Sequence, residues 1–265
     1  MIRSVKGLVK KTILVVFSER TSTKIIQHPV WTPFFWFRVK MRRVVQWVEF
    51  IRVKTSGSGS TLGLLQEIKK RVTEESVDFI MKEMPEAVFF DNRYSLLEYA
   101  LSRKSEGLIA EFGVDRGASI NYLANLTREE IHGFDSFEGL PEVWKGHSDY
   151  SKRFRNQGIA PYVRKNVTLH VGCFEDSLPK FLELYQEDFG FIHIDSDLYV
   201  SSKIIFEQCR LRIKPGTIIV FDEYMNYPGW RNNEYKAFHE YVKGSNVKFK
   251  YFAYSGYSVG ISIIG

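Results

Sequence analysis

Short, largely apolar runs recur through the C-terminal two thirds of this 265-residue chain, each followed by a glycine or an acidic residue. The runs occupy residues 108–110, 131–134, 167–171, 191–194 and 217–221. Short, largely apolar runs that recur at this spacing and are bounded by turn or acidic residues are typical of the strands of an α/β protein. The pattern therefore predicts an open α/β sheet with five consecutive strands of this kind.

The acidic residues that follow these runs are expected to lie together. A carboxylate follows four of the five runs directly, at Glu111, Asp135, Asp195 and Asp222. The remaining run ends at Gly172. Because the carboxyl ends of parallel strands line one crevice, where α/β sheets bind ligands, the sequence predicts an acidic binding edge.

The chain closes with two strand-like segments, 246–255 and 257–264, that meet at Gly256. Their aromatic and β-branched residues around a Ser-Gly turn predict an antiparallel hairpin. A mostly parallel sheet that ends in a hairpin is typical of class I S-adenosylmethionine-dependent methyltransferases and unusual for nicotinamide dehydrogenases. Helical spacing over 64–72 and 76–84 predicts helices ahead of the first strand, where they commonly form a lid.

The segment after the first strand has the composition of a cofactor-binding loop. Gly113 and Gly117 allow tight turns, and the helix predicted from Ala118 offers free N–H groups to a polar ligand. The spacing is GxxxG, whereas dinucleotide-binding loops carry GxGxxG. The loop alone therefore predicts a strand-turn-helix unit, with or without a ligand.

Four motifs in order give the chain a family resemblance. EFGVDRGAS, GFDSFEGLP, HIDSDLYVSS and IKPGTIIVFDEY resemble the macrocin O-methyltransferase family over roughly residues 85–245. Members of that family methylate sugar hydroxyls with S-adenosylmethionine and a divalent metal. The resemblance implies a class I methyltransferase fold, S-adenosyl-L-methionine as cofactor, and Mg²⁺.

The resemblance also implies which residues hold the cofactor. Glu111 and the loop glycines would enclose its methionine part, residues 135–137 would meet the ribose, and residues 172–174 would edge the adenine. Arg116 would bind the cofactor carboxylate or, alternatively, is a solvated residue at a helix start. The predicted cofactor-binding residues are Glu111, Gly113, Arg116, Gly117, Asp135, Ser136, Phe137, Gly172, Cys173 and Phe174.

Asp195, Asp222 and Glu223 are the predicted metal ligands, because Mg²⁺ prefers oxygen donors. The family usually has two aspartates where this chain has Asp222-Glu223, so the longer Glu223 would shift outward or lie behind the direct ligands. The alternative is that these acids only cap loops and carry surface charge.

A sugar hydroxyl needs its proton removed before methyl transfer, and a bound divalent ion lowers its pKa. The predicted catalytic residues are Asp195 and His193, although a strand histidine below a site is often only a structural neighbour. Other candidates for the base are Asp197, His239 and His147, and the sequence does not choose among them. Candidates for substrate contact are Tyr199, Trp230 and Arg231, and candidates for lining the lid are Asn92, Arg93 and Tyr94.

The N-terminal 54 residues are a separate feature, with twelve Lys or Arg, two Glu and seven Trp or Phe between residues 31 and 50. Because the whole chain has a net charge of +6, the remainder is mildly acidic. The segment could pack as a helical cap or dimer contact, lie on a membrane surface, or bind nucleic acid. Its apolar runs are too short for a membrane span or a signal peptide.

These features predict two parts: an extension and Gly/Ser-rich flexible linker over 1–60, and a methyltransferase domain over 61–265 with a helical lid at 61–100. Two cysteines make no disulfide framework, which suits a cytoplasmic protein. If the extension binds lipid, the protein would lie at the inner face of the membrane. The predicted function is metal-assisted O-methylation of a sugar or glycosylated small molecule. Alternatives are a non-catalytic cofactor-binding or membrane-docking protein and an RNA methyltransferase, which lacks support because basic charge does not surround the predicted pocket.

Overall fold

The computed structural model describes residues 58–142, 154 and 157–265. Gly63–Gly265 form one compact unit. The basic, aromatic segment 1–54 lies outside the described residues, so every interpretation of that segment stays a prediction. Among the helices of the described part, none combines the length and hydropathy that crossing a membrane requires.

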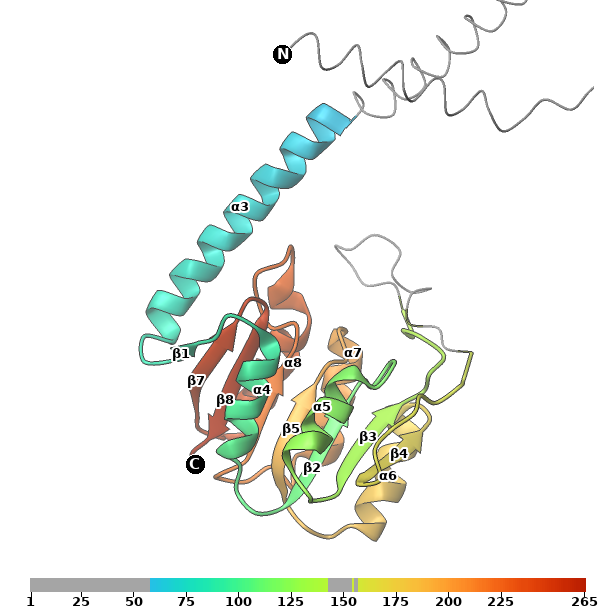
Figure 1. Cartoon of the computed structure of the whole chain (residues 1–265). Helices are drawn as coiled ribbons and strands as arrows, with labels where there is room; N and C mark the ends of the chain where they lie inside the picture. The colour runs from blue at the N-terminus through green and yellow to red at the C-terminus, as the bar shows by residue number, and fades with distance from the viewer. Residues whose placement is uncertain (1–57, 143–153, 155–156) are drawn as a thin grey trace, which may run out of the picture. The chain divides into compact units, whose positions relative to one another are not determined.

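Eight strands in the described part of the chain form a mixed sheet, in the order β1-β7-β8-β6-β5-β2-β3-β4 (Figure 1). The strands are β1 Val88–Phe89, β2 Leu108–Phe112, β3 Ile131–Asp135, β4 Val167–Val171, β5 Phe189–Ile194, β6 Ile218–Phe221, β7 Phe249–Ser255 and β8 Ser258–Ile263. β8 runs antiparallel to β6 and β7, and the remaining pairs are parallel. The five predicted parallel strands and the C-terminal hairpin are confirmed.

Six α-helices flank the sheet within the described residues: α3 Ser58–Glu83, α4 Arg93–Ser102, α5 Ala118–Leu126, α6 Phe174–Leu184, α7 Tyr199–Cys209 and α8 Glu234–Ser245. A short 3-10 helix, η1, covers Trp230–Asn232. Figure 1 shows α4 and α5 on one face of the sheet, with α6, α7 and α8 on the other.

Burial on both faces explains why the strands read as apolar runs. Successive side chains of a strand point to opposite faces. In β2, Ile109 packs in the apolar cluster that contains α4 and α5, whereas Ala110 and Phe112 pack in the cluster of α6, α7 and α8. Phe79 in the C-terminal part of α3 joins the second cluster, as does Met84, the residue after the helix.

Two details differ from the sequence prediction. Residues 58–60, predicted within a flexible linker, form the first turn of α3, although serine and glycine are weak helix formers. The helix that the sequence predicts from residue 64 onward begins earlier, at Ser58. The short strand β1 was not predicted, because two exposed residues at a sheet edge leave no periodic pattern.

The chain reverses direction across the sheet between β2 and β5. β2 pairs with β3 on one side and with β5 on the other, although β5 comes two strands later in sequence than β3. Such a switch point separates the loops at the carboxyl ends of two neighbouring strands and leaves a crevice for ligands. The loops of β2 and β5 therefore form the centre of the predicted edge.

Gly113 brings these two loops into close contact. Its backbone has a φ of 93°, and an added Cβ would overlap the carbonyl oxygen of Asp195. The Gly113 N–H donates to Phe134, and the Asp195 N–H donates to Phe112. A glycine is needed here both for its conformation and for the missing side chain.

We expect Gly113→Ala to destabilise the domain by about 3 kcal/mol, from left-handed strain and a backbone clash together. The matched control is Gly256→Ala, since Gly256 has a φ of 56° with open space around it. That control should lose only about 1 kcal/mol. Urea unfolding of both variants gives the comparison, and equal losses would contradict the close contact of the two loops.

Candidate cofactor and metal site

A cavity of about 1190 Å³ lies at the carboxyl edge of the parallel strands. Single drug-sized ligands usually occupy about 300–1000 Å³, so this cavity has room for a cofactor and an acceptor together. Residues of α3 and the loops that follow β2, β3, β4, β5 and β6 line it. Among the predicted site residues, those lining the cavity are Gly113, Arg116, Asp135, Ser136, Gly172, Cys173, Phe174, Asp195, Asp222 and Glu223.

Four predicted site residues do not line the cavity. Glu111 and His193 are fully buried below it, and Phe137 is 1% exposed. Gly117 caps α5 in the left-handed conformation, with a φ of 78°. These residues lie behind the loops that line the cavity, and their predicted contacts with a bound molecule stay predictions.

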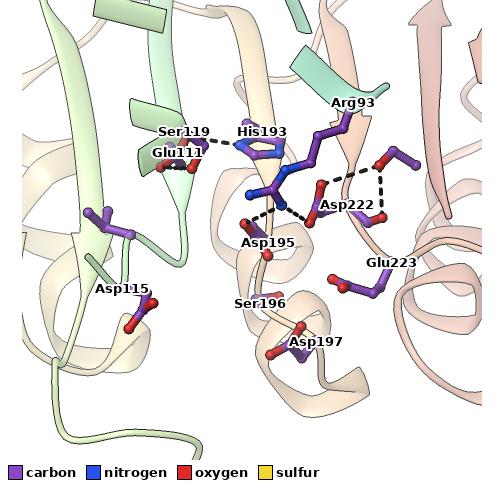
Figure 2. Close-up of polar contacts among 12 residues, drawn as sticks. Arg93, Glu111, Asp115, Ser119, His193, Asp195, Ser196, Asp197, Asp222 and Glu223 are labelled. Carbon is purple, nitrogen blue, oxygen red and sulfur yellow. Dashed lines mark hydrogen bonds and ion pairs between the residues drawn. The ribbon is translucent and has the colours of Figure 1, made fainter. Parts of the chain in front are cut away.

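Glu111 and His193 form a buried polar pair on neighbouring strands (Figure 2). His193 Nδ1 lies 2.9 Å from Glu111 Oε2, and the Ser119 hydroxyl donates to Glu111 Oε1 at 2.9 Å. His193 Nε2 is buried and has no hydrogen-bond partner among the described residues. The arrangement fixes the imidazole ring and presents Nε2 away from Glu111.

Asp135 connects the loop after β2 to its own loop. One carboxylate oxygen accepts from the N–H groups of Val114 and Asp115, both at 2.8 Å, and the other accepts from the Phe137 N–H at 2.7 Å. A carboxylate offers about four lone-pair positions, so about one remains for a further donor such as a ribose hydroxyl. The role of Asp135 in ribose binding stays a prediction, and the structure adds a role in holding the glycine loop.

The predicted metal ligands divide into two neighbouring groups. Ligand atoms of His193, Asp195 and Asp222 lie within 4.8 Å of one another, as do those of Asp195, Asp197 and Glu223. Asp195 belongs to both groups. Asp197, predicted only as a candidate base, therefore lies where it could also hold a cation.

Arg93 provides positive charge beside this cluster. It starts α4, pairs with Asp222, and has a guanidinium nitrogen 3.8 Å from an Asp195 oxygen (Figure 2). Burial alone would lower the pKa of Arg93, but Asp222 and Asp195 raise it above the usual value. The sequence suggested Arg93 only as a lid residue, since nothing in a local motif signals a partner 129 positions away.

No motif marked Glu234 either, a fully buried acid below the same loops.

Several other candidates lie away from the cavity. The Tyr199 hydroxyl bonds to Glu240, Trp230 is buried, and Arg231 pairs with Glu75 on α3. None of these three predicted contacts lines the cavity.

Of the remaining candidate bases, one lies away from the cavity, one falls outside the described residues and one lines the cavity. His239 lies among the hydroxyls of Tyr224 and Tyr251. His147 falls outside the described residues. Asp197 remains as a candidate base that lines the cavity.

The crowded carboxyls have raised pKa values. Burial, followed by the neighbouring acids, raises the pKa of Asp195 and of Glu223 well above the usual range. Burial and Glu234 raise the pKa of Asp197 to about 8. In addition, Glu223 Oε2 is buried without a hydrogen-bond partner in the described part of the chain. An all-oxygen donor set with an unpartnered buried oxygen fits a hard divalent cation, which would offset the repulsion.

This electrostatic strain predicts a pH dependence of stability. Between its ordinary pKa of 3.8 and its folded pKa of about 8, Asp197 binds more protons in the folded than in the unfolded state. Stability of the metal-free protein should therefore fall as the pH rises through that interval. A cation bound to ionised carboxylates would reverse the loss, so Mg²⁺ should raise the melting temperature more at about pH 8 than at about pH 5.

Differential scanning fluorimetry with and without Mg²⁺ measures this effect, with NaCl at equal ionic strength as the control for screening. Equal Mg²⁺ shifts at the two pH values would contradict a cation site in the cluster.

Comparisons with known proteins bear on the fold and the family of the chain. A family described as a methyltransferase domain matches residues 110–224, which span the loops from β2 to β6. A curated relative is the 8-demethyl-8-(2,3-dimethoxy-alpha-L-rhamnosyl)-tetracenomycin-C 4'-O-methyltransferase of Streptomyces olivaceus, 28% identical over 158 residues. That match covers 51% of this chain and 59% of the relative, so the chain spans about three fifths of the relative's length.

Two solved structures share the fold. The O-methyltransferase NovP is 18% identical with a TM-score of 0.51, covering 65% of this chain and 80% of NovP. CalS11, a calicheamicin methyltransferase, is 18% identical with a TM-score of 0.50, covering 91% of this chain and 99% of CalS11. Strand order and these two structures show the class I methyltransferase fold, and residues 110–224 match a methyltransferase domain; in motif order the chain is similar to the macrocin O-methyltransferases.

Proposed function

We propose that this chain is an S-adenosylmethionine-dependent O-methyltransferase that acts, with a divalent cation, on a hydroxyl of a sugar or glycosylated small molecule. The observation that carries the proposal is the meeting of five strand-end loops at one cavity, with the glycine loop and the acidic cluster both lining it. The printed name of the curated relative, a rhamnosyl 4'-O-methyltransferase, supports the same class of acceptor.

The cofactor would occupy the part of the cavity bordered by β2, β3 and β4. Gly113, which has no side chain, would let the methionine end of the cofactor approach the backbone closely. The N-terminus of α5 would offer that end the positive end of a helix dipole. Asp135 would accept from the ribose at its remaining position. Cys173 and Phe174 would form the adenine edge, where an apolar wall suits a flat heterocycle.

Asp195, Asp222 and Glu223 would hold the cation, with Asp197 adjacent to them. When bound, a divalent cation would lower the pKa of the acceptor hydroxyl and align two neighbouring oxygens of the acceptor. Arg93 shares Asp222 and Asp195 with that site, so it would offset part of the negative charge of these two carboxylates.

Methyl transfer is an in-line displacement, so the acceptor oxygen must lie behind the methyl group of the sulfonium. Asp195 is the better placed of the two predicted catalytic residues, since it lines the cavity and keeps 23% of its side chain exposed. A carboxylate oxygen of Asp195 would accept the hydroxyl proton. His193, held by Glu111 below the cavity, would position the acidic loop and not touch the acceptor.

The charge of the cavity wall favours an uncharged acceptor. Among the described residues, eight acidic and three basic side chains line the cavity. Such a wall repels phosphate-rich polymers, so an RNA acceptor is disfavoured. The apolar side chains of Leu65, Ile68 and Val72 on α3 line the same cavity and would pack against the body of the acceptor.

The test is transfer of a labelled methyl group from S-adenosylmethionine to a panel of glycosylated metabolites and free methyl glycosides. We expect a methylated hydroxyl and S-adenosylhomocysteine in equal amounts, with activity lost in excess EDTA and restored by Mg²⁺. Full activity in EDTA would remove the cation from the proposal, and binding of the cofactor without any transfer would favour a non-catalytic protein.

A further inference from the structure

Glu234 is a buried acid that none of the roles above uses. It is the first residue of α8 and is 0% exposed. One carboxylate oxygen, Oε1, accepts from the N–H groups of Ser196 and Asp197 at 3.3 and 3.2 Å. The other, Oε2, accepts from the Glu223 N–H at 3.3 Å. A single side chain thus holds the loops that follow β5 and β6.

The location of Glu234 is electrostatically unfavourable. Burial, followed by Glu223 and Asp222, raises the pKa of Glu234 well above its usual range. No Lys, Arg or His within the described residues forms an ion pair with it at 4.0 Å or less. Among the described residues, three backbone N–H groups donate to the carboxylate, and the start of α8 adds to this because a helix N-terminus favours negative charge.

The loops that Glu234 holds carry the candidate cation ligands. Asp197 adopts a left-handed backbone with a φ of 61°, which costs free energy for a residue other than glycine. The N–H of this strained residue is one of the groups that Glu234 accepts from. Glu234 also accepts from the backbone N–H of Glu223. The side chain of Glu223 faces Asp195 and Asp197 in Figure 2. Glu234 therefore sets both the conformation of one loop and its separation from the other.

We propose that Glu234 is a positioning residue that holds the two acidic loops at the spacing a divalent cation requires. This inference rests on the proposed metal-assisted function. Glu234 touches neither cofactor nor acceptor, since it does not line the cavity. Its effect should therefore fall on cation affinity and leave cofactor affinity nearly unchanged.

The variant Glu234→Gln tests this directly. An amide matches the carboxylate in shape but presents one acceptor and one donor, so one loop faces an N–H where it needs an oxygen. We expect the Kd for Mn²⁺, measured by electron paramagnetic resonance with S-adenosylhomocysteine bound, to rise at least about tenfold, equivalent to about 1.4 kcal/mol. The Kd for S-adenosylhomocysteine, measured by calorimetry, should stay within about twofold.

The matched control is Glu240→Gln, because Glu240 is an exposed carboxylate two turns later on α8 and should leave both Kd values unchanged. Glu234→Asp provides a second variant, since it keeps the charge but is one methylene shorter and cannot reach both loops. If Glu234→Gln folds poorly, a weakened Mn²⁺ affinity in Glu234→Asp supports the inference.

The outcomes separate this inference from the proposed function. If the wild-type protein binds Mn²⁺ and both Glu234 variants bind it equally well, the positioning role is wrong and the metal-assisted function stands. If the wild-type protein binds no Mn²⁺, the metal-assisted function is wrong and the positioning role fails with it. A loss of S-adenosylhomocysteine affinity equal to the loss of Mn²⁺ affinity would show a general structural role and overturn the inference.

Discussion

Replacing Asp222 with asparagine is expected to reduce methyl transfer by about a thousandfold or more, or about 4 kcal/mol in the activation free energy. The amide keeps the shape of the side chain and its hydrogen bond from the Ser258 hydroxyl. It removes the negative charge that pairs with Arg93 and supplies a weaker oxygen donor to a cation. Arg93 would then pair with Asp195 alone and compete for the proposed base.

Steady-state kinetics and calorimetry with S-adenosylhomocysteine separate the two parts of this expectation. The turnover number should fall while cofactor affinity stays nearly constant, since Asp222 lies outside the β2–β4 part of the cavity. Glu175→Gln is the control, because Glu175 is an exposed carboxylate that lines the same cavity outside the cluster. Wild-type turnover in Asp222→Asn would contradict the assigned role.

The second large effect is expected for Asp135→Ala, which should raise the Kd for S-adenosylhomocysteine by about 30-fold or more, or about 2 kcal/mol. The variant loses the acceptor of three backbone N–H groups and the proposed ribose contact together. The loop after β2 would lose the support that holds it against the β3 loop. Calorimetric titration measures the change.

Asp176→Ala is the matched control, since Asp176 is an exposed acid in the first turn of α6. Asp135→Asn separates loop support from charge: it keeps one acceptor oxygen and should give an intermediate Kd. Unchanged cofactor affinity in Asp135→Ala would remove Asp135 from the cofactor site.

The centre of the sheet could be predicted because strands β2, β5 and β6 are buried on both faces. Continuous apolar runs such as 191–194 are a strong local signal, and Gly256 marks the turn of the hairpin. β1 could not be predicted, since its two residues are exposed and depend on pairing with β7. The start of α3 was misplaced because local composition at 58–60 favours a linker, whereas the long helix continues through it.

The candidate site was predictable where residues lie at the carboxyl end of a strand or in the loop that follows it. Asp195 and Asp222 lie at the cavity because both strands end there. Glu111 follows the same rule in sequence, but it is still within β2, and pairing with His193 keeps it below the cavity.

Arg93 and Glu234 act through contacts with distant loops. Glu234 meets Ser196 and Asp197 across 38 and 37 positions, a distance at which no spacing rule operates. Only the three-dimensional structure could reveal such contacts, because they depend on how α4 and α8 pack beside the sheet.

The proposed metal-assisted methyl transfer requires that the cofactor and the cation share one cavity at the ends of the parallel strands. Anomalous diffraction from crystals grown with S-adenosylhomocysteine and Mn²⁺ measures both positions at once. We expect a manganese peak among Asp195, Asp222 and Glu223, with S-adenosylhomocysteine bound beside Gly113 and Asp135. A manganese peak away from these carboxylates, or S-adenosylhomocysteine bound elsewhere, would contradict it.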